Sequence, residues 1–133
     1  MKKSSRMQTD VGLVFSLKVL IKAVLLALAV YIILAFLVTV VINFRSELEV
    51  KLPTLAYVAQ YLTVFVTGIA AGRAAEQSGW LHGLGAGMVF AIIVLVVGSF
   101  LLPVKSPVAG RVLWQVLPAA LLGMGGGAVG ANL

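Results

Sequence analysis

The chain contains no cysteine among its 133 residues, and only four of its residues are acidic. Without cysteine there is no disulfide framework, and no thiolate that could bind a metal or carry out redox chemistry. Charged residues of both signs amount to 11% of the chain, against roughly 25% in an average soluble domain. Hydrophobic residues make up 62%, and the mean hydropathy is +1.14. This composition excludes an ordinary soluble domain and indicates a membrane protein.

The strongest single signal is the stretch 23–42, which contains no charged residue, glycine or proline. A helix of this length spans roughly 30 Å, the thickness of the hydrocarbon core of a bilayer. A helix at a surface that faces water would carry a polar stripe, and this one has none. The apolar segment is also too long for a signal-peptide core. We therefore interpret it as a retained first membrane span.

Three further apolar stretches follow, separated by short connections. Pro53 suits the first turn of a helix, Arg73 ends the second apolar run, and Pro103 stops the third. Short connections force neighbouring helices to be antiparallel. The sequence predicts an all-α, four-helix transmembrane bundle with up-down-up-down topology and short loops, in one domain. The expected segments are a basic, amphipathic lead-in over 1–17 and spans over about 20–42, 53–72, 80–102 and 111–132.

The distribution of lysine and arginine predicts the orientation. The net charge of +6 arises largely from basic residues before the first span, which points to topology and lipid contact and not to a nucleic-acid partner. We expect both termini to lie in the cytoplasm, although the small excess leaves dual topology open. This arrangement puts Lys2, Lys3, Arg6, Lys18, Lys22 and Arg73 inside, and Arg45, Lys51, Lys105 and Arg111 outside.

Glycines recur at four-residue spacing in the last three spans but are absent from the first. Such spacing places them on one face of a helix, where another backbone can approach closely. The alternative is that glycine is simply common in membrane helices. We interpret the pattern as a packing surface, formed either within one chain or across a dimer. The residues assigned to it are Gly68, Gly72, Gly83, Gly87, Gly123, Gly127 and Gly130.

Polar chemistry is concentrated in the turn between the second and third spans. Arg73, Glu76 and His82 lie there close together in sequence. They predict either a small site for a lipid headgroup or an anion, or an ordinary interfacial loop. A lone histidine without a second soft ligand nearby is not a metal site. No cofactor or metal is expected.

The middle of every predicted span is free of ionisable residues. Proton-coupled exporters keep an ionisable side chain at that depth, and the small multidrug exporters, which have the same length, depend on a glutamate in the first helix. Gln60 and Gln115 either bond between helices or line a polar path together with the threonines. The polar groups that remain within the spans are Thr39, Gln60, Thr63, Thr67, Ser99 and Gln115. No catalytic set can be assembled at one depth, so enzyme activity is not expected.

The second span ends in GRAA, and a turn leads from it into GWLHGLGAG at residues 79–87. These motifs resemble a family of small four-span bacterial membrane proteins of unknown function, typical of Firmicutes. The resemblance implies a bacterial cytoplasmic membrane location and transfers no site residues. We expect a non-enzymatic accessory or scaffold component that packs through its glycine faces against itself or a larger membrane partner. The alternative is a small homo-oligomeric channel or exporter.

Overall fold

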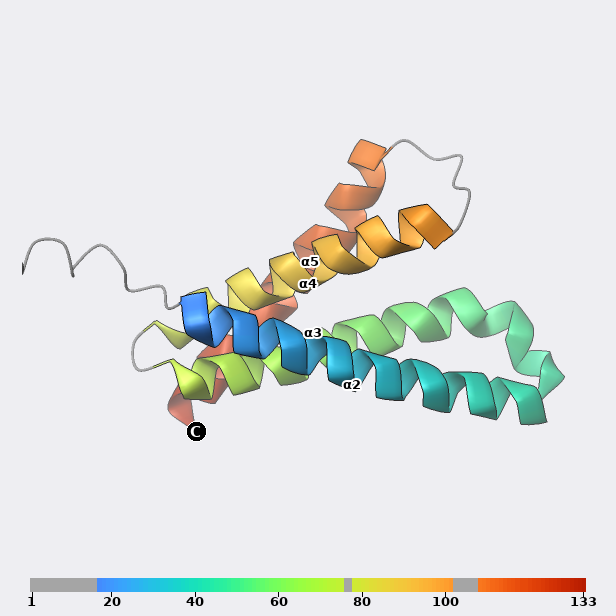
Figure 1. The fold of residues 1–133 in the computed structure, drawn as a ribbon, viewed down its shortest axis with the longest axis horizontal. Helices are drawn as coiled ribbons and strands as arrows, with labels where there is room; N and C mark the ends of the chain where they lie inside the picture. The colour runs from blue at the N-terminus through green and yellow to red at the C-terminus, as the bar shows by residue number, and fades with distance from the viewer. Residues whose placement is uncertain (1–16, 76–77, 102–107) are drawn as a thin grey trace, which may run out of the picture.

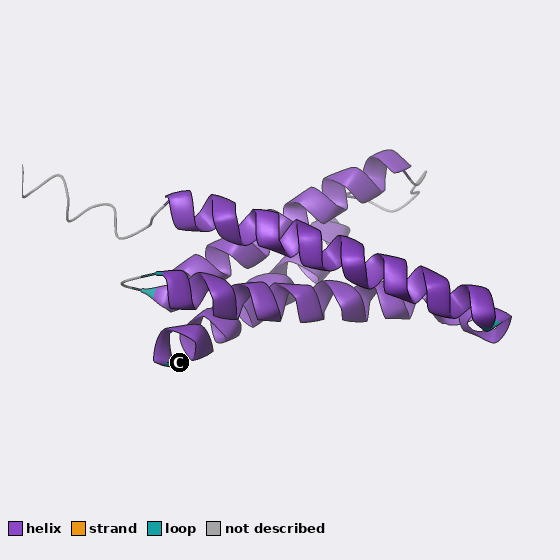
Figure 2. Ribbon diagram, turned by 60° about the horizontal axis from the view of Figure 1, so that its bottom comes forward, coloured by secondary structure: helices purple, strands orange, loops and turns teal. Residues whose placement is uncertain are grey.

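The computed structural model describes residues 17–75, 78–101 and 108–133 and consists of helices joined by short connections (Figure 1). In the ranges described there is no strand (Figure 2). The four long helices are each apolar and long enough to cross a membrane. The predicted all-α transmembrane bundle is confirmed. Its elements are α2 (Leu17–Phe44), the 3-10 helix η1 (Ser46–Lys51), α3 (Leu52–Ala74), α4 (Gly79–Leu101) and α5 (Val108–Asn132).

Two of the connections between the long helices have a defined local structure. The segment between the first two spans forms η1, and Pro53 lies in the first turn of α3, as its missing amide hydrogen allows. Ser78, just before α4, has a positive φ of 55°. Its carbonyl accepts the first amides of the helix, from Leu81 at 3.0 Å and His82 at 3.3 Å. The predicted lead-in lies, except for Leu17, outside the described residues.

The helices form two hairpins, α2 with α3 and α4 with α5, which are close at one end and diverge at the other (Figures 1 and 2). The close end holds the beginnings of α2 and α4 and the ends of α3 and α5. Helix α5 packs along both α3 and α4, whereas α2 packs on α3 and α4. The bundle is therefore tight at one membrane face and open between the hairpins at the other.

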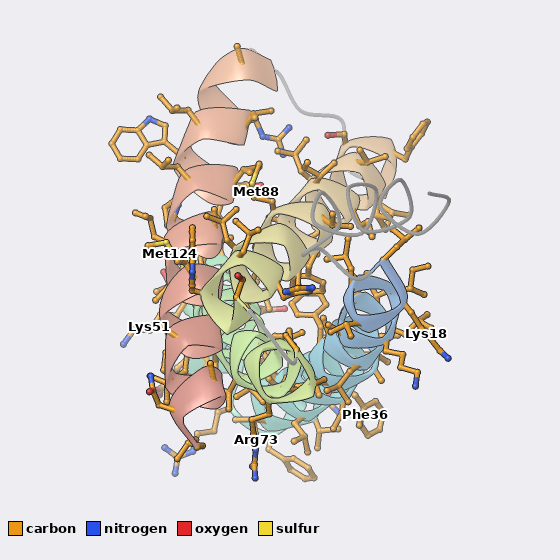
Figure 3. All side chains as sticks on the ribbon, turned by 90° about the vertical axis from the view of Figure 1, so that its left-hand side faces the viewer. Lys18, Phe36, Lys51, Arg73, Met88 and Met124 are labelled. Atoms are coloured by element: carbon orange, nitrogen blue, oxygen red, sulfur yellow. The ribbon has the colours of Figure 1, made fainter. Side chains whose placement is uncertain are left out.

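Helix α2 attaches to the other helices through a narrow strip of small residues. Ala23, Val24 and Ala27 are its buried residues, and the ring of Tyr31 meets Phe90 of α4 edge-on at 5.6 Å between centroids. Only 6% of the most apolar stretch of α2 is buried, against 44% for the second span. Its bulky side chains therefore face outward, as Phe36 does in Figure 3.

Candidate functional site

The close end of the bundle is built on direct contact between backbones. A Cβ atom added to Gly68 would lie 2.5 Å from the carbonyl oxygen of Gly123, and one added to Gly87 would lie 2.6 Å from that of Ala119. Both distances are about 1 Å shorter than a normal non-bonded contact. All seven glycines predicted to pack lie in this region, which we name the glycine core. It comprises Gly68, Gly72, Gly79, Gly83, Gly87, Gly123, Gly126, Gly127 and Gly130.

The glycine core lies inside the chain. Gly68 and Gly72 of α3 meet Gly123 and Gly127 of α5. The same helix is met from its other side by Gly79, Gly83 and Gly87 of α4. Of the two arrangements that the spacing allowed, the structure has the one within a single chain. These faces are therefore covered by helices of the same chain.

A cavity of about 350 Å³ lies beyond the glycine core, on the side where the hairpins diverge. All four long helices contribute to it, and most of its wall is apolar. We name it the hairpin cleft. It is lined by Tyr31, Leu52, Pro53, Ala56, Tyr57, Gln60, Val94, Leu95, Gly98, Arg111 and Gln115.

The hairpin cleft contains polar groups from three helices. Gln60 is only 3% exposed, and its side-chain Nε2 has no hydrogen-bond acceptor. The Nε2 of Gln115 donates to the hydroxyl of Tyr57 at 3.2 Å. Arg111 is half-buried, one turn before Gln115 on α5. None of the described residues that line the cleft is acidic, so the guanidinium of Arg111 is its one formal charge.

Sequence reasoning grouped Gln60 with Gln115 as polar groups within the spans, and the structure places both at the same cleft. Sequence reasoning did not assign Tyr57 or Arg111 to this group. Tyr57 lies one turn before Gln60 on α3, a signal that was available in the sequence. Arg111 was assigned only to the topology count, because nothing local shows that the start of α5 faces the start of α3.

The threonines near Gln60 belong to the packed interior. Thr63 is fully buried and donates its hydroxyl to the carbonyl of Ala59 at 2.7 Å. Thr67 is 2% exposed, and its Oγ1 has no hydrogen-bond partner. Neither threonine is among the described residues that line the cleft. The polar path that sequence analysis considered is thus reduced to the part that contains the two glutamines.

Two of the three residues of the predicted polar turn lie in different surroundings. Arg73 is exposed, and its side chain extends away from the bundle (Figure 3). His82 is 1% exposed, and its Nδ1 donates to the carbonyl of Ser78 at 3.1 Å. Glu76 lies outside the described residues. His82 is therefore a buried side chain in the first turn of α4.

A smaller groove lies between α2 and α3 at the close end of the bundle. Its volume is about 180 Å³, and its wall is almost entirely apolar. Lys22 is the one charged residue among the described residues that line it. Ala70, Ala71 and Ala74 of α3 form the floor.

In the ranges that the structure describes, no group of three His, Cys, Asp or Glu side chains is placed to hold a metal ion.

The chain matches the family described as "Protein of unknown function (DUF3792)" over residues 16–130. The chain belongs to this family. The matched region includes α2, α3, α4, nearly all of α5, the glycine core and the hairpin cleft. No curated protein and no solved structure gave a significant match. The DUF3792 chain is thus a multi-pass membrane protein whose function has to be argued from its own cleft.

Proposed function

We propose that this protein is a non-enzymatic accessory component of the bacterial cytoplasmic membrane, and that it acts by holding a membrane-embedded guest in the hairpin cleft. The cleft and its unpaired, buried Gln60 amide are the observation that carries the proposal. The proposal includes a Firmicutes-type origin, which the sequence resemblance supports. It also includes the cytoplasmic position of both termini, which the excess of basic residues at the N-terminal end supports.

The tight packing of the glycine core favours a function in binding a guest over a function in transporting a solute across the membrane. At Gly68 and Gly87 the neighbouring backbones leave too little space even for a methyl group. Interiors that are packed backbone to backbone hold their shape, because small displacements lose many contacts at once. The glycine core would fix the angle between the two hairpins. A guest that enters the cleft could not pass through the core to the other side of the membrane.

A larger membrane partner or a second copy would then have to use another surface. The outer face of α2 is the surface that we assign to it. Ile32 is 66% exposed and Phe36 67% exposed, on a helix whose apolar stretch is almost entirely unburied. An accessory protein of this design would hold its guest on one side of α2 and contact its partner on the other.

A small homo-oligomeric channel or exporter is the second candidate. The observation that favours it is the position of Gln60 and Gln115 at one cleft, with Arg111 toward its membrane face. Assembly of several copies would be needed to continue a polar path past the glycine core. Flux of small ions and dyes from liposomes that contain the purified protein would support this second function over binding.

The test of the proposed function is to fill the cleft. A side chain at Gly98 meets no atom within 4 Å of its Cβ, and Gly98 lines the cleft, so Gly98→Leu should occupy the cavity without disturbing the bundle. Gly125→Leu is the matched control, because its Cβ also meets nothing within 4 Å and Gly125 lies away from the cleft.

Native mass spectrometry in mild detergent measures which guests remain bound to each variant. We expect the wild type and Gly125→Leu to retain a stoichiometric guest and Gly98→Leu to lose it. Equal retention by all three would contradict a function based on the cleft. Loss of retention together with unchanged liposome flux would separate the binding function from the channel alternative.

A further inference from the structure

We infer that the guest of the hairpin cleft is an anionic phospholipid, whose phosphate pairs with Arg111 and whose acyl-ester region lies beside Gln60. This inference rests on the proposed function and specifies its ligand. It concerns the leaflet at the divergent end of the bundle, where α3 and α5 begin and α4 ends.

Three side chains of the cleft carry donor hydrogens that can serve a ligand. The Gln60 Nε2 has no acceptor, and an amide NH₂ carries two donor hydrogens. Tyr57 accepts a hydrogen bond from Gln115, so its own hydroxyl hydrogen is available to a ligand. The guanidinium of Arg111 offers further donors and binds phosphate in two-point fashion. Such a site selects a ligand that is rich in acceptors and negatively charged.

The order of these donors along the helices follows the order of groups in a phospholipid. Arg111 lies in the first turn of α5, near the membrane surface, where arginine is expected to meet headgroups. Gln60 lies eight residues after Leu52, which is about 12 Å into the membrane along α3. Phosphate lies at the surface of a bilayer and the ester carbonyls lie below it. The apolar walls at Ala56, Val94 and Leu95 then meet the acyl chain.

The energetics of Gln60 favour a bound acceptor. A buried amide without an acceptor is costly, because it has lost water and gained nothing in return. Within a membrane no bulk water is available to replace the partner. The Nε2 of Gln60 is itself buried, so a lipid carbonyl in the cleft would remove this cost once the side chain turns its amide toward the ligand. The cavity volume of about 350 Å³ lies at the lower end of the range for small-molecule sites. It suits the glycerol region and the upper part of one chain.

The experiment compares lipids that share their acyl chains and differ in headgroup. The purified protein in mild detergent is titrated with phosphatidylglycerol or phosphatidylcholine, and bound lipid is counted by native mass spectrometry. The variants are Arg111→Gln, Gln60→Leu and Gly98→Leu. Lys22→Gln is the control, because it removes a positive charge from the other lipid-sized groove, at the opposite end of the bundle. Circular dichroism of each variant checks that its helices are intact.

We expect the wild type to retain one phosphatidylglycerol with about tenfold higher affinity than phosphatidylcholine. Both lipids carry a phosphate, but in phosphatidylcholine its charge is neutralised by the choline of the same headgroup, which weakens the attraction to Arg111. Arg111→Gln should remove this preference, Gln60→Leu should weaken retention of both lipids, and Lys22→Gln should leave the preference unchanged. Loss of the preference in Lys22→Gln instead of Arg111→Gln would place the lipid in the other groove and overturn the inference.

Two further results would also overturn it, and they distinguish it from the proposed function. If the two lipids bound with equal affinity and Gly98→Leu still lost them, the guest would not be specifically an anionic lipid. The cleft would nevertheless still bind a guest. A co-purifying transmembrane polypeptide that Gly98→Leu releases would have the same meaning. Gly98→Leu could also retain phosphatidylglycerol as strongly as the wild type does. The cleft would then not be the binding site, and both proposals would be wrong.

Discussion

Replacement of Gly68 by alanine is the sharpest test of the glycine core, because the structure gives the size of the conflict. The added Cβ would lie 2.5 Å from the carbonyl oxygen of Gly123 and 3.2 Å from its Cα. Non-bonded heavy atoms rest at about 3.5 Å, so α3 and α5 would have to separate by about 1 Å at this point. Both atoms belong to backbone, which cannot rotate away as a side chain would.

The expected cost follows from comparison with Gly125→Ala. Alanine favours a helix over glycine by about 1 kcal/mol in water, and this gain is common to both variants, so it cancels. What remains at Gly68 is overpacking, which typically costs about 1–3 kcal/mol. The Cβ at Gly125 meets no atom within 4 Å. We therefore expect Gly68→Ala to be less stable than Gly125→Ala by about 1–3 kcal/mol.

The assay is unfolding of the purified protein in mixed micelles, followed by circular dichroism as the fraction of denaturing detergent rises. Gly68→Ala should unfold at a lower fraction than Gly125→Ala, with a similar slope. Equal midpoints, or a more stable Gly68→Ala, would refute the reasoning, because it would mean that α3 and α5 do not meet backbone to backbone at this position.

Four other substitutions test separate parts of the structure by the same assay. Phe90→Ala should cost about 3–5 kcal/mol, because Phe90 is fully buried and its ring meets Tyr31 of α2; a loss below 1 kcal/mol would mean that α2 is not anchored there. Gln60→Leu should gain about 1 kcal/mol in lipid-free detergent, since it removes an amide whose Nε2 is unpaired; a loss would show that the amide has a partner. His82→Ala should cost about 2–4 kcal/mol through the cavity that it leaves. Arg73→Ala, at an exposed position, should change stability by less than about 0.5 kcal/mol, and equal effects of these two substitutions would contradict the burial of His82.

The glycine core also changes how the glycine pattern of the sequence is interpreted. Four-residue spacing predicts that a helix face can meet another backbone closely. It does not say which backbone, because a helix of the same chain and a helix of a second copy satisfy the same rule. The contacts of Gly68 with Gly123 and of Gly72 with Gly127 use these faces within one chain. Interaction with other proteins therefore has to involve different surfaces.

The sequence alone was sufficient for the membrane class and the four helices. Both depend on local properties, because a long apolar run must satisfy its backbone hydrogen bonds internally once it is in lipid. Short connections then leave the antiparallel order as the natural topology. These arguments need no knowledge of which helix faces which, and they hold for residues 17–44 as well as for the glycine-rich spans.

Only the tertiary structure decided where the hairpins meet and where they part. The hairpin cleft joins Gln60 of α3 with Arg111 of α5, residues that are far apart in sequence and were assigned to unrelated roles. The burial of His82 is of the same kind, since it depends on the helices packed around the start of α4. Such features arise from the angle between helices, which the backbone contacts of the glycine core set and which no local pattern of residues encodes.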